Sequence, residues 1–229
     1  MYKHLFFDLD HTIWDFDKNA EETLYELYHA YDLFQLGLHS PDLFIEAYTK
    51  NNHQLWTDYH LGKISKEVLR TTRFSKTFAE LGVSPDLIPE KFEDDYVAIC
   101  PTKTNLFPHA HDTLEYLQAK YTLHIISNGF KESTELKIGN TGLAKYFCTI
   151  FISEIIGFNK PDKAIFEYAL STTEATASES LMIGDSLEAD IRGAQDFGMK
   201  AIYFNPARSD KPDDVVQQIH CLSELVKIL

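Results

Sequence analysis

The spacing of apolar residues predicts helices along most of the chain between residues 20 and 99. In the first helix, apolar side chains recur at steps of three and four residues, which places them on one helical face: Ala20, Leu24, Leu27, Tyr31 and Phe34. A glycine, Gly37, follows the last of these positions and is expected to close the helix.

Three further apolar stripes each follow a serine that can cap a helix. Ser40 and Ser84 precede a proline, the residue favoured at the first helical position, and Ser65 precedes the stripe between them. The stripes comprise Phe44, Tyr48, Leu55 and Tyr59, then Phe74, Phe78 and Leu81, and finally Ile88, Phe92, Tyr96 and Ile99. Gly62 and Gly82 end the second and third helices. Four helices with short connections predict a small helical bundle.

From about residue 104 onward, short apolar runs alternate with amphipathic stretches. The runs at residues 122–126, 150–152, 181–183 and 201–204 predict strands, and the stretches at 112–120, 132–140, 163–170 and 187–197 predict helices. A similar apolar run at residues 5–7 predicts a buried first strand. This alternation indicates an α/β fold, a doubly wound, Rossmann-like parallel sheet with helices on both faces.

The predicted bundle interrupts this sheet after its first strand. We therefore expect a core domain formed by residues 1–14 and 103–229, with residues 15–102 inserted as a four-helix-bundle cap. Residues 13–17 and 100–108 are the expected hinges, and two prolines stiffen the second of them.

The net negative charge of the chain bears on which binding partners are expected. Asp and Glu number 35 against 21 Lys and Arg, which gives a formal net charge of -14. Such a surface repels the phosphates of nucleic acids, so a polynucleotide partner is not expected. A small anionic ligand would need its charge met locally, by a metal, a lysine or a helix N-terminus.

The chain carries no sequence sign of export or membrane insertion. No apolar stretch is long enough to span a membrane, and the early acids interrupt the run that a signal peptide requires. Cys100, Cys148 and Cys221 are far apart and form no C-x-x-C pair, so we expect reduced cysteines in the core. These features favour a cytoplasmic protein without a membrane partner, and both monomer and homodimer stay open.

The first predicted strand ends on two acids, Asp8 and Asp10, which alternation points towards the same side of the chain. Like charges a few ångströms apart are unfavourable unless a cation lies between them, or unless one acts as nucleophile and the other as acid. The pair therefore predicts a metal.

Polar residues also follow the later strands, and the carboxyl ends of parallel strands are where ligands bind in such sheets. In chain order these residues are Ser127, Asn128 and Gly129 after the second strand, Lys160 after the third, and Asp185 and Asp190 after the fourth. Each element alone is a weak signal, but their order along the chain is specific.

These motifs resemble those of the haloacid dehalogenase superfamily of phosphohydrolases. The matching segments are DLDHT at residues 8–12, SNG at 127–129, NKPD at 159–162 and GDSLEAD at 184–190. The resemblance covers the full length, and the expected insertion is similar to the four-helix cap of that superfamily. Segments 55–65, 125–130 and 160–170 further resemble the YjjG-type branch, a group of pyrimidine nucleotide 5'-nucleotidases.

The resemblance implies Mg²⁺ as cofactor, bound by the side chains of Asp8 and Asp185 and by the backbone carbonyl of Asp10. Asp8 would attack phosphorus, which requires that the negative charge of the substrate be neutralised. Lys160 would hold Asp8 and the phosphoryl oxygens. Asp10 would protonate the leaving alkoxide and later activate the water that hydrolyses the aspartyl-phosphate.

The remaining motif residues have supporting roles in this interpretation. Ser127 and the backbone amides of Asn128 and Gly129 would bind phosphoryl oxygens. Thr12 would brace the turn that carries Asp10, and Asp190 would orient Lys160 or its loop.

Three residues of the expected cap, Trp56, Tyr59 and Arg73, are candidates for a pocket in which a nucleobase stacks. Their periodicity favours the alternative that they pack within the helical bundle.

We thus expect a Mg²⁺-dependent hydrolase of small phosphomonoesters, with pyrimidine nucleoside 5'-monophosphates favoured. A phosphatase or phosphomutase acting on sugar phosphates or phosphoglycolate is the main alternative, and an inactive, metal-binding partner protein is the non-enzymatic one. Asp10 argues against a dehalogenase, because the resemblance implies that dehalogenases lack the second acid. A response-regulator receiver would be shorter and would lack the helical insertion.

Overall fold

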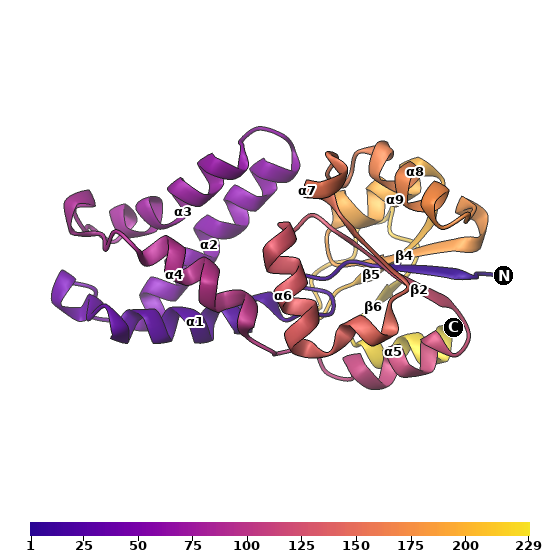
Figure 1. Cartoon of the computed structure of the whole chain (residues 1–229), viewed down its shortest axis with the longest axis horizontal. Coiled ribbons are helices and arrows are strands. Elements are labelled where there is room, and N and C mark those ends of the chain that lie inside the picture. Colours follow the sequence, from indigo (N-terminus) through magenta and orange to yellow (C-terminus); the bar gives the residue numbers. More distant parts are fainter. The chain divides into compact units, whose positions relative to one another are not determined.

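The computed structural model describes residues 1–229 and divides into two compact units. The core unit comprises Met1–Phe16 and Thr104–Leu229, and the helical unit comprises Asp17–Lys103. The core is thus discontinuous in sequence, because the helical unit is inserted directly after the first strand and its following turn (Figure 1).

The core unit is built on one six-stranded parallel sheet. Its strands are β1 (His4–Phe7), β2 (Thr122–Ser127), β3 (Thr149–Ile152), β4 (Ser180–Gly184), β5 (Lys200–Phe204) and β6 (Gln218–Ile219). Their order across the sheet is β3-β2-β1-β4-β5-β6, and every neighbouring pair is parallel. The predicted doubly wound α/β fold is confirmed. The two-residue strand β6 is too short to give a sequence pattern.

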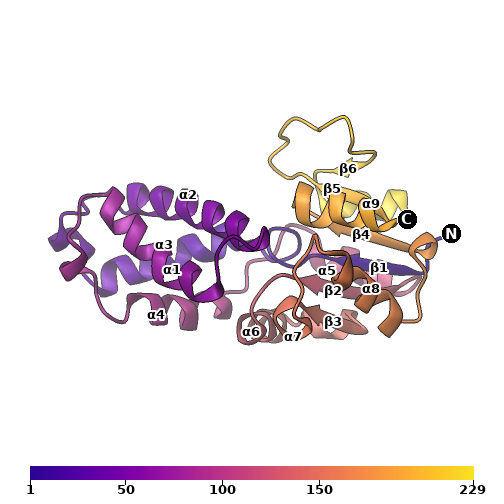
Figure 2. The ribbon, with the colours of Figure 1, turned by 90° about the horizontal axis from the view of Figure 1, so that it is seen from above.

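Helices cover both faces of this sheet (Figures 1 and 2). They are α5 (Ala110–Gln118), α6 (Lys131–Thr141), α7 (Ser153–Ile156), α8 (Lys163–Thr172), α9 (Gly193–Phe197) and α10 (Leu225–Ile228). Phe6 and Met182 of the sheet pack with Phe166 of α8 in one buried cluster. Leu5 and Phe7, which alternate with Phe6, are also fully buried. Burial on both faces explains why β1 is a continuous apolar run.

The segment after β4 differs from the single helix expected at residues 187–197. It begins as a π-helical turn, Leu187–Arg192, and continues as α9. The Ser186 carbonyl accepts hydrogen bonds from the amides of both Asp190 and Ile191 (2.9 and 3.1 Å), and the wider turn follows from the second of these. Such turns are frequent at functional sites.

The helical unit contains the expected four helices. They are α1 (Phe16–Ala30), α2 (Pro41–His60), α3 (Lys66–Glu80) and α4 (Phe92–Ile99), with short 3-10 turns between and after them. Ser40 and Ser65 cap α2 and α3 as predicted, because their hydroxyls accept hydrogen bonds from the amides of Leu43 (3.3 Å) and Val68 (3.2 Å).

Two predictions for this unit are wrong. The first helix ends at Ala30 because Asp32 adopts a left-handed conformation, and Phe34, predicted to be inward, is 51% exposed. The fourth helix does not open at Ser84. Only a three-residue turn follows that serine, and α4 starts at Phe92, beyond Pro89, whose missing N–H disfavours a continuous helix.

The cysteines have free thiols, but only Cys100 is buried. Cys221 is partly exposed and Cys148 is exposed. The expectation that all three belong to the core is therefore wrong for Cys148, which directly precedes β3. No helix combines the length and the apolarity needed to cross a membrane.

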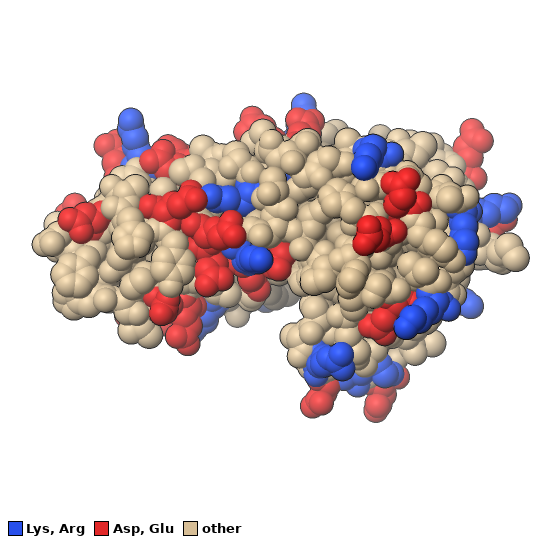
Figure 3. Space-filling view, turned by 90° about the horizontal axis from the view of Figure 1, so that it is seen from below, with Lys and Arg blue, Asp and Glu red and all other residues tan.

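Acidic side chains are prominent on one face of the helical unit (Figure 3). On the face drawn in Figure 3 they gather over the helical unit, whereas acidic and basic side chains are interspersed over the core unit. In the sequence, acids outnumber basic residues in both units, 15 to 9 in residues 17–103 and 20 to 12 in the remainder.

Aromatic rings form the interior of the helical unit. Phe92 of α4 lies at the centre, with ring centroids 4.8 Å from Phe74, 5.4 Å from Phe78 and 6.0 Å from Phe44. It is 1% exposed. Edge-to-face contacts of this kind add to the stabilisation that burial alone gives.

Replacing Phe92 with alanine should therefore destabilise the protein by about 3–5 kcal/mol, because it leaves a cavity among three rings. Phe34→Ala is the matched control, since the same atoms are removed from an exposed position, and it should cost about 0.5 kcal/mol or less. Urea unfolding followed by circular dichroism measures both. Equal losses in the two variants would contradict this account of the bundle.

Candidate active site

The two acids after β1 lie in a tight turn at the edge of the sheet. The Asp8 amide donates to the carbonyl of Ile183 in β4 (2.9 Å), so the ladder continues one residue beyond the strand. The Ile13 and Trp14 amides both donate to the Leu9 carbonyl (2.9 Å each), which folds the chain back around Asp10. His11, between the acids and this closure, adopts φ 62°, a strained conformation for a residue other than glycine.

The strand order explains why distant acids meet here. Strand β1 lies between β2 and β4, so residues at the ends of these three strands share one edge of the sheet. The carboxylates of Asp8, Asp185 and Asp190 approach one another, with an oxygen of each within 4.8 Å of the others. This is the position at which the chain reverses its direction across the sheet, where ligands bind in this class of fold.

Lys160 lies between two of these acids. Its ammonium contacts Asp8 Oδ1 and Asp190 Oδ1, both at 2.6 Å, and the residue is 1% exposed. Burial lowers the pKa of Lys160, but the two carboxylates outweigh it and raise the pKa above its ordinary value. The ammonium therefore stays charged across the physiological range.

The side chain of Asn128 fixes the loop that carries Lys160. Its amide nitrogen donates to the Lys160 carbonyl (2.9 Å), and its amide oxygen accepts from the Lys160 N–H (2.8 Å). The next peptide bond, to Pro161, is cis. Sequence reasoning considered only the backbone amide of Asn128. A side-chain amide, which has both a donor and an acceptor, can pair with a peptide group in this way.

Ser127 and Gly129 form a compact turn after β2. The Gly129 amide donates to Ser127 Oγ at 2.9 Å. A Cβ atom on Gly129 would lie only 2.7 Å from Oγ1 of Thr134, so this position requires glycine. The Thr134 hydroxyl is buried and has no hydrogen-bond partner in the protein.

Asp190 lies beneath the end of β4. Its Oδ2 accepts a hydrogen bond from the Ser186 amide (2.9 Å), and its side chain occupies the space that a Cβ on Gly184 would need, 2.3 Å from Oδ2. The glycine and the π-helical turn together allow this carboxylate to reach Lys160.

Thr12 has a partner that the sequence did not indicate. Its hydroxyl donates to Asp185 Oδ1 at 3.0 Å, whereas the expectation was that it would brace the turn at Asp10. Thr12 is fully buried and thus orients the acid that follows β4.

Burial and mutual repulsion disfavour the ionised form of the acids at this site. Burial raises the pKa of Asp8 to about 7, and the charges of Asp190 and Asp10 act in the same direction, although Lys160 opposes them. Burial and the charge of Asp8 likewise raise the pKa of Asp185 well above its ordinary value. The protein alone therefore does not compensate the negative charge at this edge of the sheet.

The donor set fits a divalent cation. Asp8 Oδ1 and Asp185 Oδ1 receive hydrogen bonds from Lys160 and Thr12, which leaves Oδ2 of each acid without a protein donor. Both oxygens of Asp190 are engaged, so Asp190 is the least available of the three. Carboxylate oxygens are the ligands that Mg²⁺ prefers.

A second buried lysine, Lys137 of α6, was not found from the sequence. Its ammonium contacts Asp10 Oδ1 at 2.6 Å, and the residue is 4% exposed. The site thus contains four acids, Asp8, Asp10, Asp185 and Asp190, and two lysines, so carboxyl groups outnumber ammonium groups there.

The candidates in the helical unit are not gathered into one pocket. Arg73 is 5% exposed, its guanidinium pairs with Glu93 (2.6 Å) and lies 4.7 Å from the ring centroid of Tyr96. Arg73 is therefore part of the bundle interior, in agreement with the alternative that this residue packs within the helical bundle. Trp56 and Tyr59 are partly exposed on α2 and meet edge to face at 5.5 Å.

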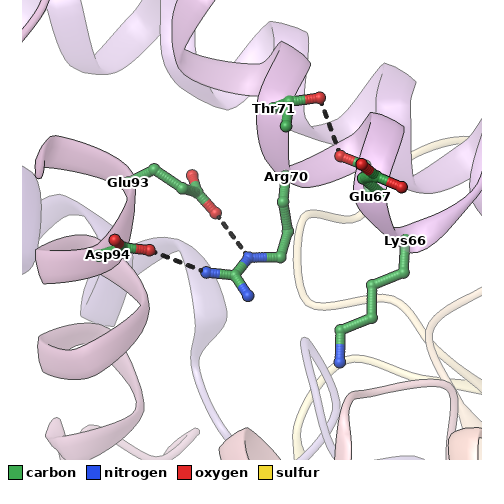
Figure 4. Close-up of a pocket in the computed structure, with 6 residues that line it drawn as sticks. All are labelled: Lys66, Glu67, Arg70, Thr71, Glu93 and Asp94. Carbon is green, nitrogen blue, oxygen red and sulfur yellow. Dashed lines mark hydrogen bonds and ion pairs between the residues drawn. The ribbon is translucent and has the colours of Figure 1, made fainter. Parts of the chain in front are cut away.

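The helical unit has a separate, charged hollow of about 440 Å³ (Figure 4). Its lining residues are Lys66, Glu67, Arg70, Thr71, Glu93 and Asp94. Arg70 pairs there with Glu93 (3.1 Å) and Asp94 (3.3 Å). None of the candidates Trp56, Tyr59 and Arg73 lines this hollow.

Known proteins resemble this chain over nearly its whole length. It is 35% identical over 209 residues to the pyrimidine 5'-nucleotidase PynA of Streptococcus pneumoniae, which covers 90% of this chain and 84% of the relative. It is 30% identical to the pyrimidine 5'-nucleotidase YjjG of Escherichia coli, covering 97% of this chain and 96% of the relative.

A solved structure of the HAD-hydrolase YfnB of Bacillus subtilis, described as bound to magnesium, superposes with a TM-score of 0.87. It shares 32% sequence identity and covers all of this chain and 98% of that one. Residues 2–198 match the family model described as haloacid dehalogenase-like hydrolase. The chain belongs to the haloacid dehalogenase-like hydrolases.

Proposed function

We propose that this hydrolase is a Mg²⁺-dependent phosphomonoesterase that works through an aspartyl-phosphate on Asp8. The observation that carries the proposal is the contact between Asp8 and the ammonium of Lys160, beside a second acid, Asp185, that has an uncommitted oxygen. A carboxylate nucleophile needs positive charge beside it when it attacks a phosphate dianion, and this arrangement supplies it.

In the first half of the reaction, a carboxylate oxygen of Asp8 forms a bond to phosphorus while the ester P–O bond breaks. Asp10 gives a proton to the leaving alkoxide. Lys160 keeps Asp8 in place and neutralises part of the phosphoryl charge. Ser127 Oγ and the amides of Asn128 and Gly129 bind phosphoryl oxygens, for which the Gly129 N–H exchanges its present partner, Ser127 Oγ.

In the second half, Asp10 accepts a proton from water as the oxygen of that water attacks phosphorus. The bond between phosphorus and Asp8 breaks, inorganic phosphate leaves, and the free carboxylate of Asp8 is restored. The Asp190 carboxylate holds the ammonium of Lys160 and the Asn128 side chain holds its backbone, so neither side chain needs to touch the substrate.

The metal would be held by the free oxygens of Asp8 and Asp185, together with the backbone carbonyl of Asp10. When bound, Mg²⁺ supplies charge neutralisation for the phosphoryl group and orients it for in-line attack. The acids fit this ion because they outnumber the two lysines of the site.

We propose pyrimidine nucleoside 5'-monophosphates as the favoured substrates. The support is that two relatives covering at least 90% of the chain are named pyrimidine 5'-nucleotidases. The acidic surface of the helical unit in Figure 3 fits a small ligand better than a polynucleotide. A cytoplasmic location is part of the proposal and is supported by three free cysteines.

The direct test is phosphate release in the presence of Mg²⁺ from a panel of nucleoside monophosphates and sugar phosphates. Selective release from pyrimidine 5'-monophosphates is expected. Asp8→Asn should lower the rate by at least about 10⁴-fold and keep the fold, because the nucleophile is lost. Preference for sugar phosphates would reject the nucleotide substrate but not the chemistry. Release at the wild-type rate by Asp8→Asn would reject the assignment of Asp8.

Asp10→Asn should slow esters with poor leaving groups most, because an alkoxide needs a proton and an activated aryl oxide does not. The loss is expected to be about 10²–10⁴-fold for an alkyl phosphate and clearly smaller for p-nitrophenyl phosphate. Steady-state kinetics on the two substrates measures this ratio. Equal losses would contradict a role for Asp10 as general acid.

Metal binding has a readout that does not depend on activity. Because the pKa of Asp8 is raised to about 7 in the folded protein, the metal-free protein should lose stability as the pH rises from about 4 to 7. Mg²⁺ relieves this repulsion only where the acids are ionised. The thermal midpoint should therefore rise with Mg²⁺ by about 5 °C at pH 8 and far less at pH 5.

Asp185→Asn should abolish this Mg²⁺-dependent rise and should itself stabilise the metal-free protein at pH 8, because one buried charge is removed. Asp196→Asn, which changes an exposed acid of α9, is the matched control and should leave the rise intact. An undiminished Mg²⁺ effect in Asp185→Asn would argue against a metal at this edge of the sheet.

A further inference from the structure

Lys137 and Asp10 form a second ion pair beside the one between Lys160 and Asp8, and in it the lysine is buried and the acid partly exposed. The Lys137 ammonium reaches from α6 to Asp10 Oδ1 at 2.6 Å. It also lies 4.3 Å from the ring centroid of Trp14 and 5.6 Å from that of Phe16. The faces of aromatic rings attract a cation, so three groups of the core unit hold this ammonium in one position.

The ion pair engages one carboxylate oxygen of Asp10 and leaves the other without a hydrogen-bond donor. Oδ1 accepts from Lys137, and Oδ2 has no donor in the protein. Oδ2 lies 3.6 Å from the position that a Cβ on Gly129 would occupy, so it faces the turn in which Ser127 and Gly129 lie. The oxygen towards the proposed phosphoryl site is therefore the uncommitted one.

From this geometry we infer that Lys137 is a positioning residue that fixes the rotamer of Asp10 and thereby assigns proton transfer to Oδ2. The inference rests on the proposed function, because it concerns the acid and base of that reaction. Lys137 has no direct contact with Asp8 or Asp185, so it acts on the reaction through Asp10.

A purely structural role explains this lysine poorly. Lys137 and Lys160 are the two buried lysines of the chain, and each contacts one of the two acids that follow β1. An apolar side chain of similar length would fill the space between α6 and the rings of Trp14 and Phe16 without the cost of burying a charge. The feature that needs an ammonium at this place is the carboxylate of Asp10.

The test compares Lys137→Met with wild type on an alkyl phosphate and on p-nitrophenyl phosphate. If Lys137 positions Asp10, the variant should lose about 10–100-fold on the alkyl ester and only a few-fold on the aryl ester. Lys137→Arg, which keeps the charge, should recover part of the loss. Lys145→Met, which removes an exposed lysine that lies over the ring of Tyr146, is the matched control and should not change either rate.

The double variant separates positioning from other roles. In the background of Asp10→Asn, the further change Lys137→Met should cost little, because both substitutions remove the same contribution. Equal losses on the two esters, or losses that multiply in the double variant, would overturn the inference. Either result would indicate that Lys137 supports the fold or contacts the substrate independently of Asp10.

The contact can also be tested without an activity assay, by the urea unfolding midpoints of the wild type, Lys137→Met, Asp10→Asn and the double variant. Lys137→Met leaves the partly exposed Asp10 without its cation, and Asp10→Asn leaves the buried ammonium of Lys137 without its anion. The double variant should therefore be more stable than the sum of the single losses predicts. Additive midpoints would overturn the inference even in an active enzyme. A wild-type protein that is silent on every phosphate would instead reject the proposed function, while the midpoints would still decide whether Lys137 and Asp10 are coupled.

Discussion

The site depends on the compensation of buried negative charge. Four carboxylates gather at one edge of the sheet, and two lysine ammonium groups offset half of their charge. Much of the local structure holds these lysines and acids in fixed positions. Asn128 pairs with the backbone of Lys160, the Ser186 amide engages Asp190, and the Thr12 hydroxyl engages Asp185. Each interaction fixes a charged side chain whose ordinary place would be in water.

The sheet topology makes this concentration of charge possible. Asp8 and Lys160 are 152 positions apart in the sequence, and Thr12 and Asp185 are 173 apart. They meet because β1 lies between β2 and β4, so that the chain winds outward in both directions from its first strand. The π-helical turn after β4 then brings Asp190 towards the lysine that Asp8, at the end of β1, also contacts. The helical unit enters the chain directly after this first turn.

The sequence was sufficient for the features that depend on local chemistry. Apolar runs predicted the five longer strands, and the serines at positions 40 and 65 predicted two helix starts, because strand burial and capping leave patterns within a few residues. The breaks at Asp32 and before Phe92 escaped prediction, since an apolar stripe can continue across a short turn.

The partners of charged groups could not be predicted in the same way. Lys137 lies on an ordinary amphipathic helix, and only the fold brings it to Asp10. The amide clamp of Asn128 and the bond from Thr12 to Asp185 likewise join different strands and loops. These contacts follow from topology, because no spacing along the chain distinguishes a buried lysine with a carboxylate partner from a solvated one.

The two ion pairs differ in a way that suits two different tasks. Lys160 is held between two carboxylates, so the cation beside Asp8 is fixed from two sides, which suits the proposed role of Asp8 as nucleophile. Lys137 meets a single carboxylate, and the rings of Trp14 and Phe16 supply the remaining stabilisation. Lys137 engages only Oδ1 of Asp10, so Asp10 keeps Oδ2 free of any donor. A group that must release a proton and later accept one needs such an oxygen, whereas a group that only attacks phosphorus depends more on being held still.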